Sequence, residues 1–341
     1  MRTPSIEKKA LFLSYIHDFR GIAILLIVSS HILMEDMDNT FYRIMSAIFL
    51  NSTIFFVFVS GFLFQHLAFK YDVKTYWKRK IKGIVIPYIL ISIPAILLRI
   101  KDTPAYIIEN HPEYASWGIF HKVAYMYLTG SHLLPFWFIP MIILFFAISP
   151  LLVYLDKTKW IYWLLPVFMI ISAFYSRDDI TQINDTFRMF AHFFSVYLLG
   201  MFYSRYKDEI ASLMDKIWPM AYLIGGVLLV ITCFEIPYVT EVIFFQKIVL
   251  CFVCVHLLKR YEGKMPQFLD FLAKISFGIY FVHYYIVIIL RKVFLMFFTY
   301  EKPTNPIMWF LNYILVVILT IIIIQIIRYI TKDKSKYLIG C

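Results

Sequence analysis

Ten apolar segments, each about the length of a membrane-spanning helix, dominate this chain. A hydrocarbon core of about 30 Å is crossed by about 20 helical residues at 1.5 Å per residue. The segments lie at 16–34, 44–68, 83–100, 133–155, 160–176, 188–204, 216–234, 243–258, 271–290 and 308–327. We therefore predict an all-α, polytopic membrane helical bundle with about ten transmembrane helices, forming a single domain over residues 1–341.

The composition supports this fold class and argues against a water-soluble domain. Of the 341 residues, 61% are hydrophobic and 16% charged, and the mean hydropathy is +0.73. Soluble domains hold about 45–50% apolar and about 25% charged residues, so one water-soluble core cannot contain this surplus. The N-terminal segment lacks the pattern of a cleaved signal peptide. Cys251 and Cys254 are spaced as C-x-x-C, but their segment is apolar, so we interpret them as buried structural thiols.

The basic residues indicate how the chain is oriented in the membrane. With the connections alternating between two sides, the side that holds both termini carries 22 of the 33 Lys and Arg residues. The positive-inside rule then predicts that both termini are cytoplasmic, which an even number of spans allows, and we expect the protein in the plasma (inner) membrane. Attraction to anionic membrane lipids accounts for the net charge of +11 without nucleic acid as a partner.

The first apolar segment contains two ionisable residues, Arg20 and His31. They are eleven residues apart, so on a helix both project from one face, about 16.5 Å apart along the axis. Ionisable groups rarely face lipid, because their exposure to hydrocarbon is energetically costly. We therefore predict that this face looks into the bundle or into a water-filled cavity.

These two residue types suggest a chemical role beside a structural one. A neutral imidazole accepts a proton near neutral pH and can activate a hydroxyl. A guanidinium stays charged and suits phosphate or carbonyl oxygens. A donor that enters from the cytoplasmic side past Arg20 could thus meet an acceptor at His31. The alternative is a structural Arg and a core His that are satisfied by their neighbours.

Five sequence motifs lie in order along the chain. The first is FRGIAILLIVSSH, in which ten residues separate Arg20 from His31. The others are FFVFVSGFLF (55–64), WKRKIKGIVIPY (77–88), FWFIPMIILFFAISPLL (136–152) and SFGIYFVHYYIV (276–287). Together they resemble the acyltransferase 3 family of multi-span membrane O-acyltransferases. His17 stands where that family often has an acidic residue, and Lys82 stands where it usually has a second Arg.

This resemblance implies transfer of an acyl group, most often acetyl, from cytoplasmic acyl-CoA to a hydroxyl of a cell-surface or exported glycan. His31 would be the general base, and Arg20 would lie on the donor's path. No cofactor is expected to be bound, because acyl-CoA (acetyl-CoA) is a co-substrate. The acceptor is expected to be a surface or lipid-linked glycan, whose identity the sequence does not reveal.

The segment 70–82 is the densest basic cluster on the predicted cytoplasmic side, with six Lys and Arg residues. CoA carries several negative charges, so we assign Arg79, Lys80 and Lys82 to its phosphates. The alternative is ordinary topology signalling, since inner loops of membrane proteins are generally basic.

Four further residues are candidates for contacts with the acceptor or for lining a cavity: Ser60, Trp137, Tyr280 and His283. Each also has a structural interpretation, such as close helix packing for Ser60 or an interfacial belt position for Trp137. Near the outer end of the ninth segment, Arg291 and Lys292 either snorkel outward or meet an anionic acceptor.

Two other functions fit the same apolar chain. A transporter or flippase of a glycan or lipid-linked sugar would also need many spans and intramembrane charges, although no half-to-half repeat is present. A non-catalytic partner in an envelope assembly is the third alternative. We predict no metal site, because no set of His, Asp and Glu has a recognisable ligand spacing. A G-x-S-x-G nucleophile motif is absent as well.

Overall fold

Helices are the only regular secondary structure among the residues that the structure, a computed structural model, describes. These residues are 12–32, 40–175, 185–234, 236–298, 303 and 305–341. The α-helices are α2 (Ser14–Ser30), α3 (Thr40–Phe49), α4 (Thr53–His66), α5 (Val73–Lys80), α6 (Ile86–Lys101), α7 (Ala105–Asn110), α8 (Ile119–Thr129), α9 (Phe138–Ala147), α10 (Ser149–Thr158), α11 (Leu165–Phe174), α13 (Thr186–Arg205), α14 (Lys207–Ile231), α15 (Val239–Arg260), α16 (Gln267–Lys274), α17 (Ser276–Phe298), α18 (Pro306–Thr331) and α19 (Ser335–Ile339). No strand occurs among the described residues, so the all-α prediction is confirmed.

Six helical stretches are long and apolar enough to cross a membrane. They are Thr40–His66, Val73–Lys101, Lys207–Ile231, Val239–Arg260, Ser276–Phe297 and Pro306–Ile339. A seventh is added when α8 and the stretch Leu134–Ala147, which are bent by 74° relative to each other, count as one span. The predicted polytopic helical bundle is thereby confirmed. The count of about ten spans and the cytoplasmic position of the termini stay predictions.

Two of the predicted spans are interrupted in the structure. The segment 44–68 consists of α3 and α4, which are separated by a short break in which Asn51 has a left-handed φ of +59°. The segment 133–155 is divided between α9 and α10, and Pro150 lies in the first turn of α10. Proline fits this position because it lacks the N–H that a continuous helix would need. Hydropathy alone did not reveal these breaks.

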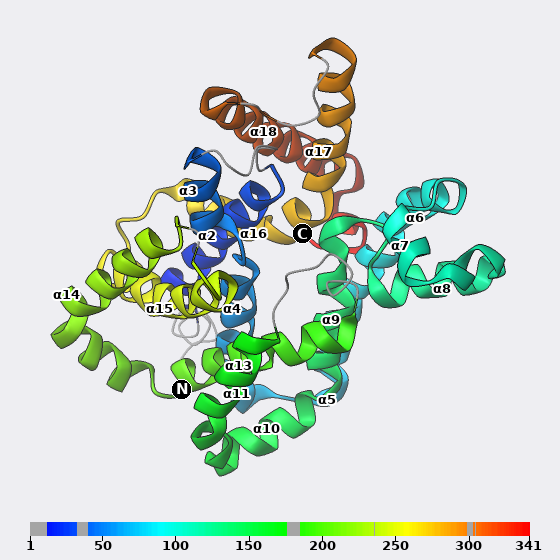
Figure 1. The fold of residues 1–341 in the computed structure, drawn as a ribbon. Coiled ribbons are helices and arrows are strands. Elements are labelled where there is room, and N and C mark those ends of the chain that lie inside the picture. Colours follow the sequence, from blue (N-terminus) through cyan, green and yellow to red (C-terminus); the bar gives the residue numbers. More distant parts are fainter. Residues whose placement is uncertain (1–11, 33–39, 176–184, 235, 299–302, 304) are drawn as a thin grey trace.

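Helix α2 lies at the centre of the molecule, among α4, α15, α16 and α17 (Figure 1). Behind it, α4 crosses α13 at very short range. A Cβ atom added to Gly61 would lie 2.0 Å from the Tyr197 carbonyl oxygen, and one added to Gly200 would lie 2.1 Å from that of Phe58. Only glycine allows two helix backbones to approach this closely. This crossing supports the wall of helices against which the first span is placed.

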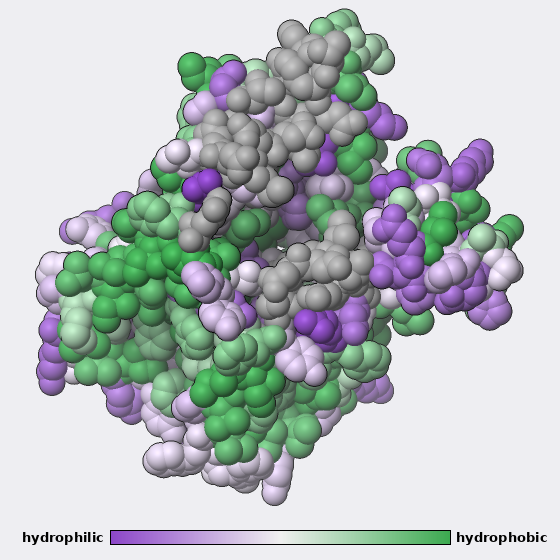
Figure 2. Space-filling view, in the orientation of Figure 1, coloured by the Kyte–Doolittle hydropathy of each residue, from purple (hydrophilic) through white to green (hydrophobic). Residues whose placement is uncertain are grey.

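The outer surface is rich in exposed apolar side chains. Figure 2 shows broad hydrophobic areas over the side of the molecule where α11 and α14 lie. On these elements and on the turn before α11, Trp163 is 86% exposed, and Phe174, Leu223 and Val227 are exposed as well. Water-soluble proteins rarely expose contiguous apolar areas of this kind. Such a surface is suited to contact with lipid chains.

Candidate active site

Helix α2 ends directly before the residue predicted to be the base. Its last residue is Ser30, and the backbone N–H of His31 donates to the Val28 carbonyl over 3.1 Å. The hydroxyls of Ser29 and Ser30 donate to carbonyls of the preceding turn. Such hydrogen bonds satisfy carbonyl groups near the end of a helix. The imidazole of His31 therefore lies just beyond the last turn.

A cavity of about 570 Å³ lies beside His31. Its wall is formed by the end of α2, the break between α3 and α4, the start of α9, the start of α15 and α17. The lining residues whose side chains carry polar atoms are Ser30, His31, Asn51, Ser52, Thr53, Trp137, Thr240 and Tyr280. Ligand sites commonly have volumes of about 300–1,000 Å³. The structure thus brings three of the predicted site residues, His31, Trp137 and Tyr280, to one cavity.

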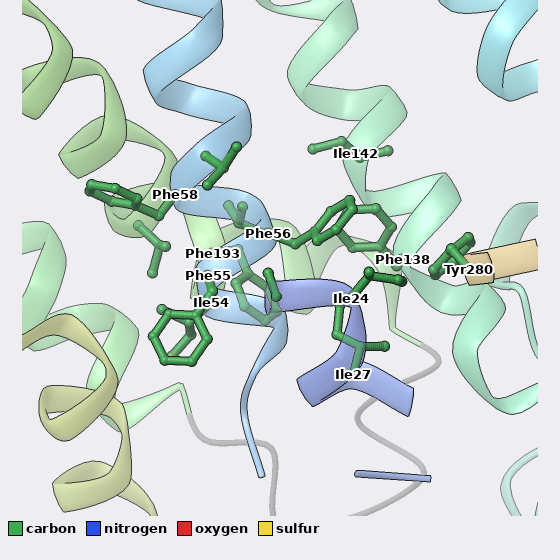
Figure 3. Close-up of a cluster of buried hydrophobic side chains, with 14 of the residues drawn as sticks. Ile24, Ile27, Ile54, Phe55, Phe56, Phe58, Phe138, Ile142, Phe193 and Tyr280 are labelled. Atoms are coloured by element: carbon green, nitrogen blue, oxygen red, sulfur yellow. The ribbon is translucent and has the colours of Figure 1, made fainter. Parts of the chain in front are cut away.

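Apolar side chains form the floor of this cavity. Ile27, Phe56 and Phe138 line it, and Figure 3 shows them next to Ile24 where α2, α4 and α9 meet. The rings of Phe56 and Phe138 are 6.2 Å apart in an edge-to-face arrangement. Ile24 is completely buried. The floor therefore consists of well-packed side chains from three separate helices.

A buried lysine holds the break between α3 and α4. Lys247 of α15 is completely buried and donates from Nζ to the carbonyl oxygens of Ala47, over 2.7 Å, and Ile48, over 2.9 Å. A cation at the C-terminal end of a helix is favourable, because the carbonyl ends carry partial negative charge. Helix α4 then starts anew at Thr53. Its N-terminal end, where N–H groups carry partial positive charge, lines the cavity.

Two aromatic residues of α17 contact the imidazole of His31. The ring centroids of His31 and His283 are 5.4 Å apart, and those of His31 and Tyr284 are 5.3 Å apart in an edge-to-face arrangement. From the same helix, Nη2 of Arg291 donates to the backbone carbonyl of His31 over 2.9 Å. The fold thus brings His31 and His283, from two distant segments of the sequence, into contact.

The hydrogen bonds of His283 define its neutral tautomer. Its Nδ1 lies 2.8 Å from the carbonyl oxygen of Ile279 and 2.9 Å from that of Tyr280. Carbonyl oxygens only accept, so Nδ1 carries the proton and Nε2 carries a lone pair. Among the described residues no hydrogen-bond donor reaches Nε2, and the side chain is completely buried. His283 thus holds an unprotonated nitrogen next to His31.

Trp137 and Tyr280 are fixed in the cavity wall. The indole of Trp137 is stacked on the ring of Phe193 at 5.7 Å with 19° between their planes. The hydroxyl of Tyr280 donates to the carbonyl of Pro135 over 2.6 Å. Both side chains are almost completely buried. They shape the cavity as rigid aromatic surfaces.

Ser60 lies outside the residues that line this cavity. Its hydroxyl donates to the carbonyl of Phe56, one turn earlier on α4, over 2.8 Å. The next residue, Gly61, is at the crossing with α13. This position fits the close-packing interpretation of Ser60.

Arg20 lies about three turns before His31, in the N-terminal half of α2, against α16. Its Nη2 donates to the carbonyl of Ala273 in the last turn of α16, and its Nε is buried without a hydrogen-bond partner among the described residues. A cation is favourable there, since it faces the C-terminal end of a helix. One observed role of Arg20 is therefore to join α2 to α16.

The cavity does not extend along α2 as far as Arg20. Its lining reaches Ile27, whereas Ala23 and Ile24, which lie between Arg20 and Ile27, are completely buried. Over the described residues, apolar packing thus separates the two groups that the sequence predicted to share one passage. A path for the donor would need side chains of the cavity floor to move.

The basic residues predicted to bind the donor are on α5 and the π-helical turn that follows it, Ile81–Val85. The side chain of Arg79 is exposed. The ammonium group of Lys80 lies over the Phe146 ring, 4.5 Å from its centroid, and is close enough to Arg20 for the two charges to interact. Phe146 is on α9, the helix that begins with Phe138 at the cavity floor. Lys80 and Arg20 thus form one cationic region at the far end of α9.

Lys82 is directed elsewhere. Its ammonium group lies 5.6 Å from the centroid of the Tyr337 ring on α19. It belongs to the π-helical turn, and such turns are frequent at functional sites. The structure therefore brings Lys80, but not Lys82, close to Arg20.

Of the two thiols predicted to be buried, that of Cys251 is buried and that of Cys254 is half-buried. All four cysteines are free, and Cys251 is completely buried. In the part of the chain that the structure describes, no group of three or more His, Cys, Asp and Glu side chains could hold a metal ion.

A family model described as an acyltransferase domain, acyltransferase 3, matches residues 13–329. The chain belongs to the acyltransferase 3 family. It is therefore a membrane acyltransferase, and this membership argues against the transporter and flippase alternative. No curated protein and no solved structure gives a significant match.

Two residues of this acyltransferase's site were not predicted from the sequence, although each had a signal there. Lys247 is a lysine within an apolar segment, where a charge is costly unless it has partners. Asn51 is a polar residue within the segment 44–68 and belongs to a residue type that tolerates left-handed backbone. These signals indicate special positions, but they do not indicate which cavity the residues would line.

Proposed function

We propose that this acyltransferase transfers an acetyl group from cytoplasmic acetyl-CoA to a hydroxyl of a cell-surface or exported glycan, in the plasma membrane. The observation that carries the proposal is the position of His31. Its imidazole lines a cavity of about 570 Å³ and contacts a second, neutral imidazole. A cavity with an imidazole and aromatic walls suits a sugar hydroxyl that meets a thioester carbonyl.

In the proposed reaction, His31 is the general base. It takes the proton of the glycan hydroxyl while the hydroxyl oxygen forms a bond to the thioester carbonyl carbon. The carbon–sulfur bond then breaks, and the CoA thiolate receives the proton from the imidazolium of His31. The products are the O-acetyl ester and CoA, and no electrons are exchanged. General base catalysis of this kind contributes about 10²–10⁴-fold in rate.

The N-terminal end of α4 is proposed to stabilise the negative charge that develops on the carbonyl oxygen. This end begins at Thr53 and lines the same cavity as His31. Helix N-termini carry partial positive charge, and fixed dipoles aimed at a developing oxyanion are an effective source of catalysis. Lys247 would act as a positioning residue, because it holds the end of α3 and so the break from which α4 starts.

His283 is proposed to support the charged form of His31. When His31 takes the proton, a cation forms next to a neutral ring whose Nε2 is a lone-pair acceptor. A nearby acceptor favours the protonated form of the partner. The second imidazole therefore helps His31 to act as base without carrying a charge of its own.

The donor is proposed to bind with its phosphates at Arg79, Lys80 and Lys82 and with its pantetheine arm near Arg20. The cationic region formed by Arg20 and Lys80 supports this assignment. Because the floor of the cavity is closed, the arm would have to displace Phe56 and Phe138 to bring its thioester to His31. Donor binding and opening of the floor are thus coupled in this proposal.

The test is the His31→Ala variant. Membranes that contain the full-length protein are supplied with labelled acetyl-CoA, and the label in the glycan fraction is measured. We expect transfer to fall by about 10²–10⁴-fold. His121→Ala is the matched control, because His121 is exposed on α8 and lies outside the cavity. Near-normal labelling by the His31 variant would refute the assignment of the base.

A further inference from the structure

Arg291 is placed beside the proposed base by α17. Its Nη2 donates to the backbone carbonyl of His31 over 2.9 Å, and its guanidinium is also a hydrogen-bond partner of the Tyr284 side chain. A residue that only snorkels would extend its charge away from the protein into water. Arg291 is instead half-buried and directed toward the end of α2. The position of Arg291 therefore suggests that its guanidinium has a function near His31.

A second guanidinium approaches the same tyrosine from α6. Nε of Arg99 donates to the carbonyl of His132 over 3.4 Å, and its charge acts on Tyr284 together with that of Arg291. The edge of the Tyr284 ring meets the imidazole of His31 at 5.3 Å between centroids. The charges of both arginines thus act on one side chain, and that side chain contacts the proposed base.

This pair of cations has no carboxylate partner within the described residues. None of the ion pairs among them includes Arg99 or Arg291. A guanidinium has five N–H donors, and the hydrogen bonds to carbonyl and hydroxyl oxygens use only part of this capacity. A charged group within a largely apolar bundle is costly unless polar or oppositely charged partners compensate it. The remaining donors are suited to a planar, bidentate oxyanion.

We propose that Arg99 and Arg291 bind a negatively charged group of the acceptor, a carboxylate or a phosphate, and so hold its hydroxyl at His31. The substrate class is then an acidic glycan or a glycan joined to its carrier through phosphate. The inference rests on the proposed function, because it assigns this end of α2 to the acceptor. Arg99 and Arg291 contact the anion and take no part in proton transfer.

Binding of three small probes to the purified full-length protein tests this proposal. Methyl β-glucuronide carries a carboxylate, glucose 1-phosphate carries a phosphate, and methyl β-glucoside is the neutral control. Titration calorimetry is expected to show at least one charged probe bound about tenfold or more tightly than the neutral one, since charge-assisted bidentate bonds are strong. The preferred charged probe distinguishes an acidic sugar from a phosphate-linked one. Equal affinities for all three, or no binding of either charged probe, would overturn the proposal.

Substitutions of the two arginines test whether the charged probes bind at Arg99 and Arg291. Arg291→Gln and Arg99→Gln should each remove most of the preference, and Arg291→Lys, which keeps the charge but loses the planar fork, should weaken it several-fold. Lys292→Gln and Lys101→Gln are matched controls, since these neighbours on α17 and α6 are exposed. If Arg291→Gln does not fold, Arg99→Gln and Arg291→Lys still carry the test. A preference that survives in these variants would contradict the assignment.

Two further measurements separate this inference from its alternatives. If Lys80→Gln removes the preference as fully as Arg99→Gln, the charged probes bind at the donor site and the proposal is wrong. Transfer of label from acetyl-CoA is scored independently in the same preparation. Charge-selective binding without any acetyl transfer would support the anion site while refuting the proposed acetyltransferase function.

Discussion

The two ends of α2 carry similar residues but differ in their surroundings. At the N-terminal end, Gly21 lies so close to α16 that an added Cβ would be 2.6 Å from the Leu269 carbonyl oxygen, and Arg20 donates to Ala273 of the same helix. At the C-terminal end, Ile27 and His31 face a cavity of about 570 Å³. One end of the helix is anchored by packing, and the other end borders open space.

This difference shows that spacing alone does not assign function to intramembrane charges. The sequence predicted that both groups avoid lipid, and in the structure each contacts other parts of the protein. For Arg20 the environment is a helix end that a cation stabilises, whereas for His31 it is a cavity and a second imidazole. A structural contact and the residue proposed as the base thus lie three turns apart along one segment.

The largest expected effect is a loss of acetyl transfer, and comparing it with the change in melting temperature distinguishes the two ends of α2. His31→Gln should lower acetyl transfer by about 10²–10⁴-fold, with little change in melting temperature, because the side chain borders a cavity. Arg20→Met should lower both quantities, since it leaves the Ala273 carbonyl unpaired at a cost of about 1–3 kcal/mol. Labelled-acetate transfer and scanning fluorimetry measure the two. A stable Arg20→Met variant would mean that the contact with α16 is dispensable.

The fold was largely predictable from the sequence, and the site only in part. Hydrophobic segments of sufficient length identify a helical bundle because lipid imposes the same requirement on every spanning helix. The contact of His31 with His283 depends on how α2 and α17 pack, and no local pattern determines this. The closed floor at Phe56 and Phe138 was likewise not predictable from the sequence. Apolar residues that line an open passage have the same sequence pattern as apolar residues that fill it.

The next effect concerns packing at the anchored end. Gly21→Ala should destabilise the protein by about 1–3 kcal/mol, because the new methyl group would clash with backbone atoms of α16, which cannot move away as a flexible side chain can. Gly226→Ala is the control, since no atom lies within 4 Å of its added Cβ, and this change should leave stability equal or slightly higher. Chemical or thermal unfolding measures both variants. Equal stability of the two would show that α2 can move away from α16.

A smaller effect is expected on acyl-chain selectivity at the cavity. Ile27→Val removes one methylene from the lining, and the ratio of propionyl to acetyl transfer should rise by about tenfold or more, since one methylene is worth about 1–3 kcal/mol in a fitted pocket. Ile16→Val makes the same change at the buried N-terminal end of α2. Both should lose about 0.5–1.5 kcal/mol of stability. A change in selectivity that both variants share would refute the link to the cavity.

The smallest effect is a pH dependence at the anchored end. The hydrogen bond from Lys274, together with its charge, lowers the pKa of the Asp270 carboxyl below its ordinary value of 3.8, and His17 of α2 adds a smaller contribution. Because this pKa is depressed in the folded state, the stabilisation is present above pH 3.8 and is lost as the pH falls through the lower value. The carboxylate is 40% exposed, so solvent screening keeps the effect below about 1 kcal/mol.

Asp270→Asn should therefore lower the melting temperature slightly at pH 6 and match the unchanged protein at the most acidic pH that both tolerate. Asp333→Asn is a control for an acidic residue outside this contact, on the short turn that follows α18. If the difference between Asp270→Asn and the unchanged protein persists at acidic pH, the lost interaction is not that of a carboxylate. The anchoring of α2 on α16 would then depend on Arg20 and on packing at Gly21, with no contribution from this pair of charges.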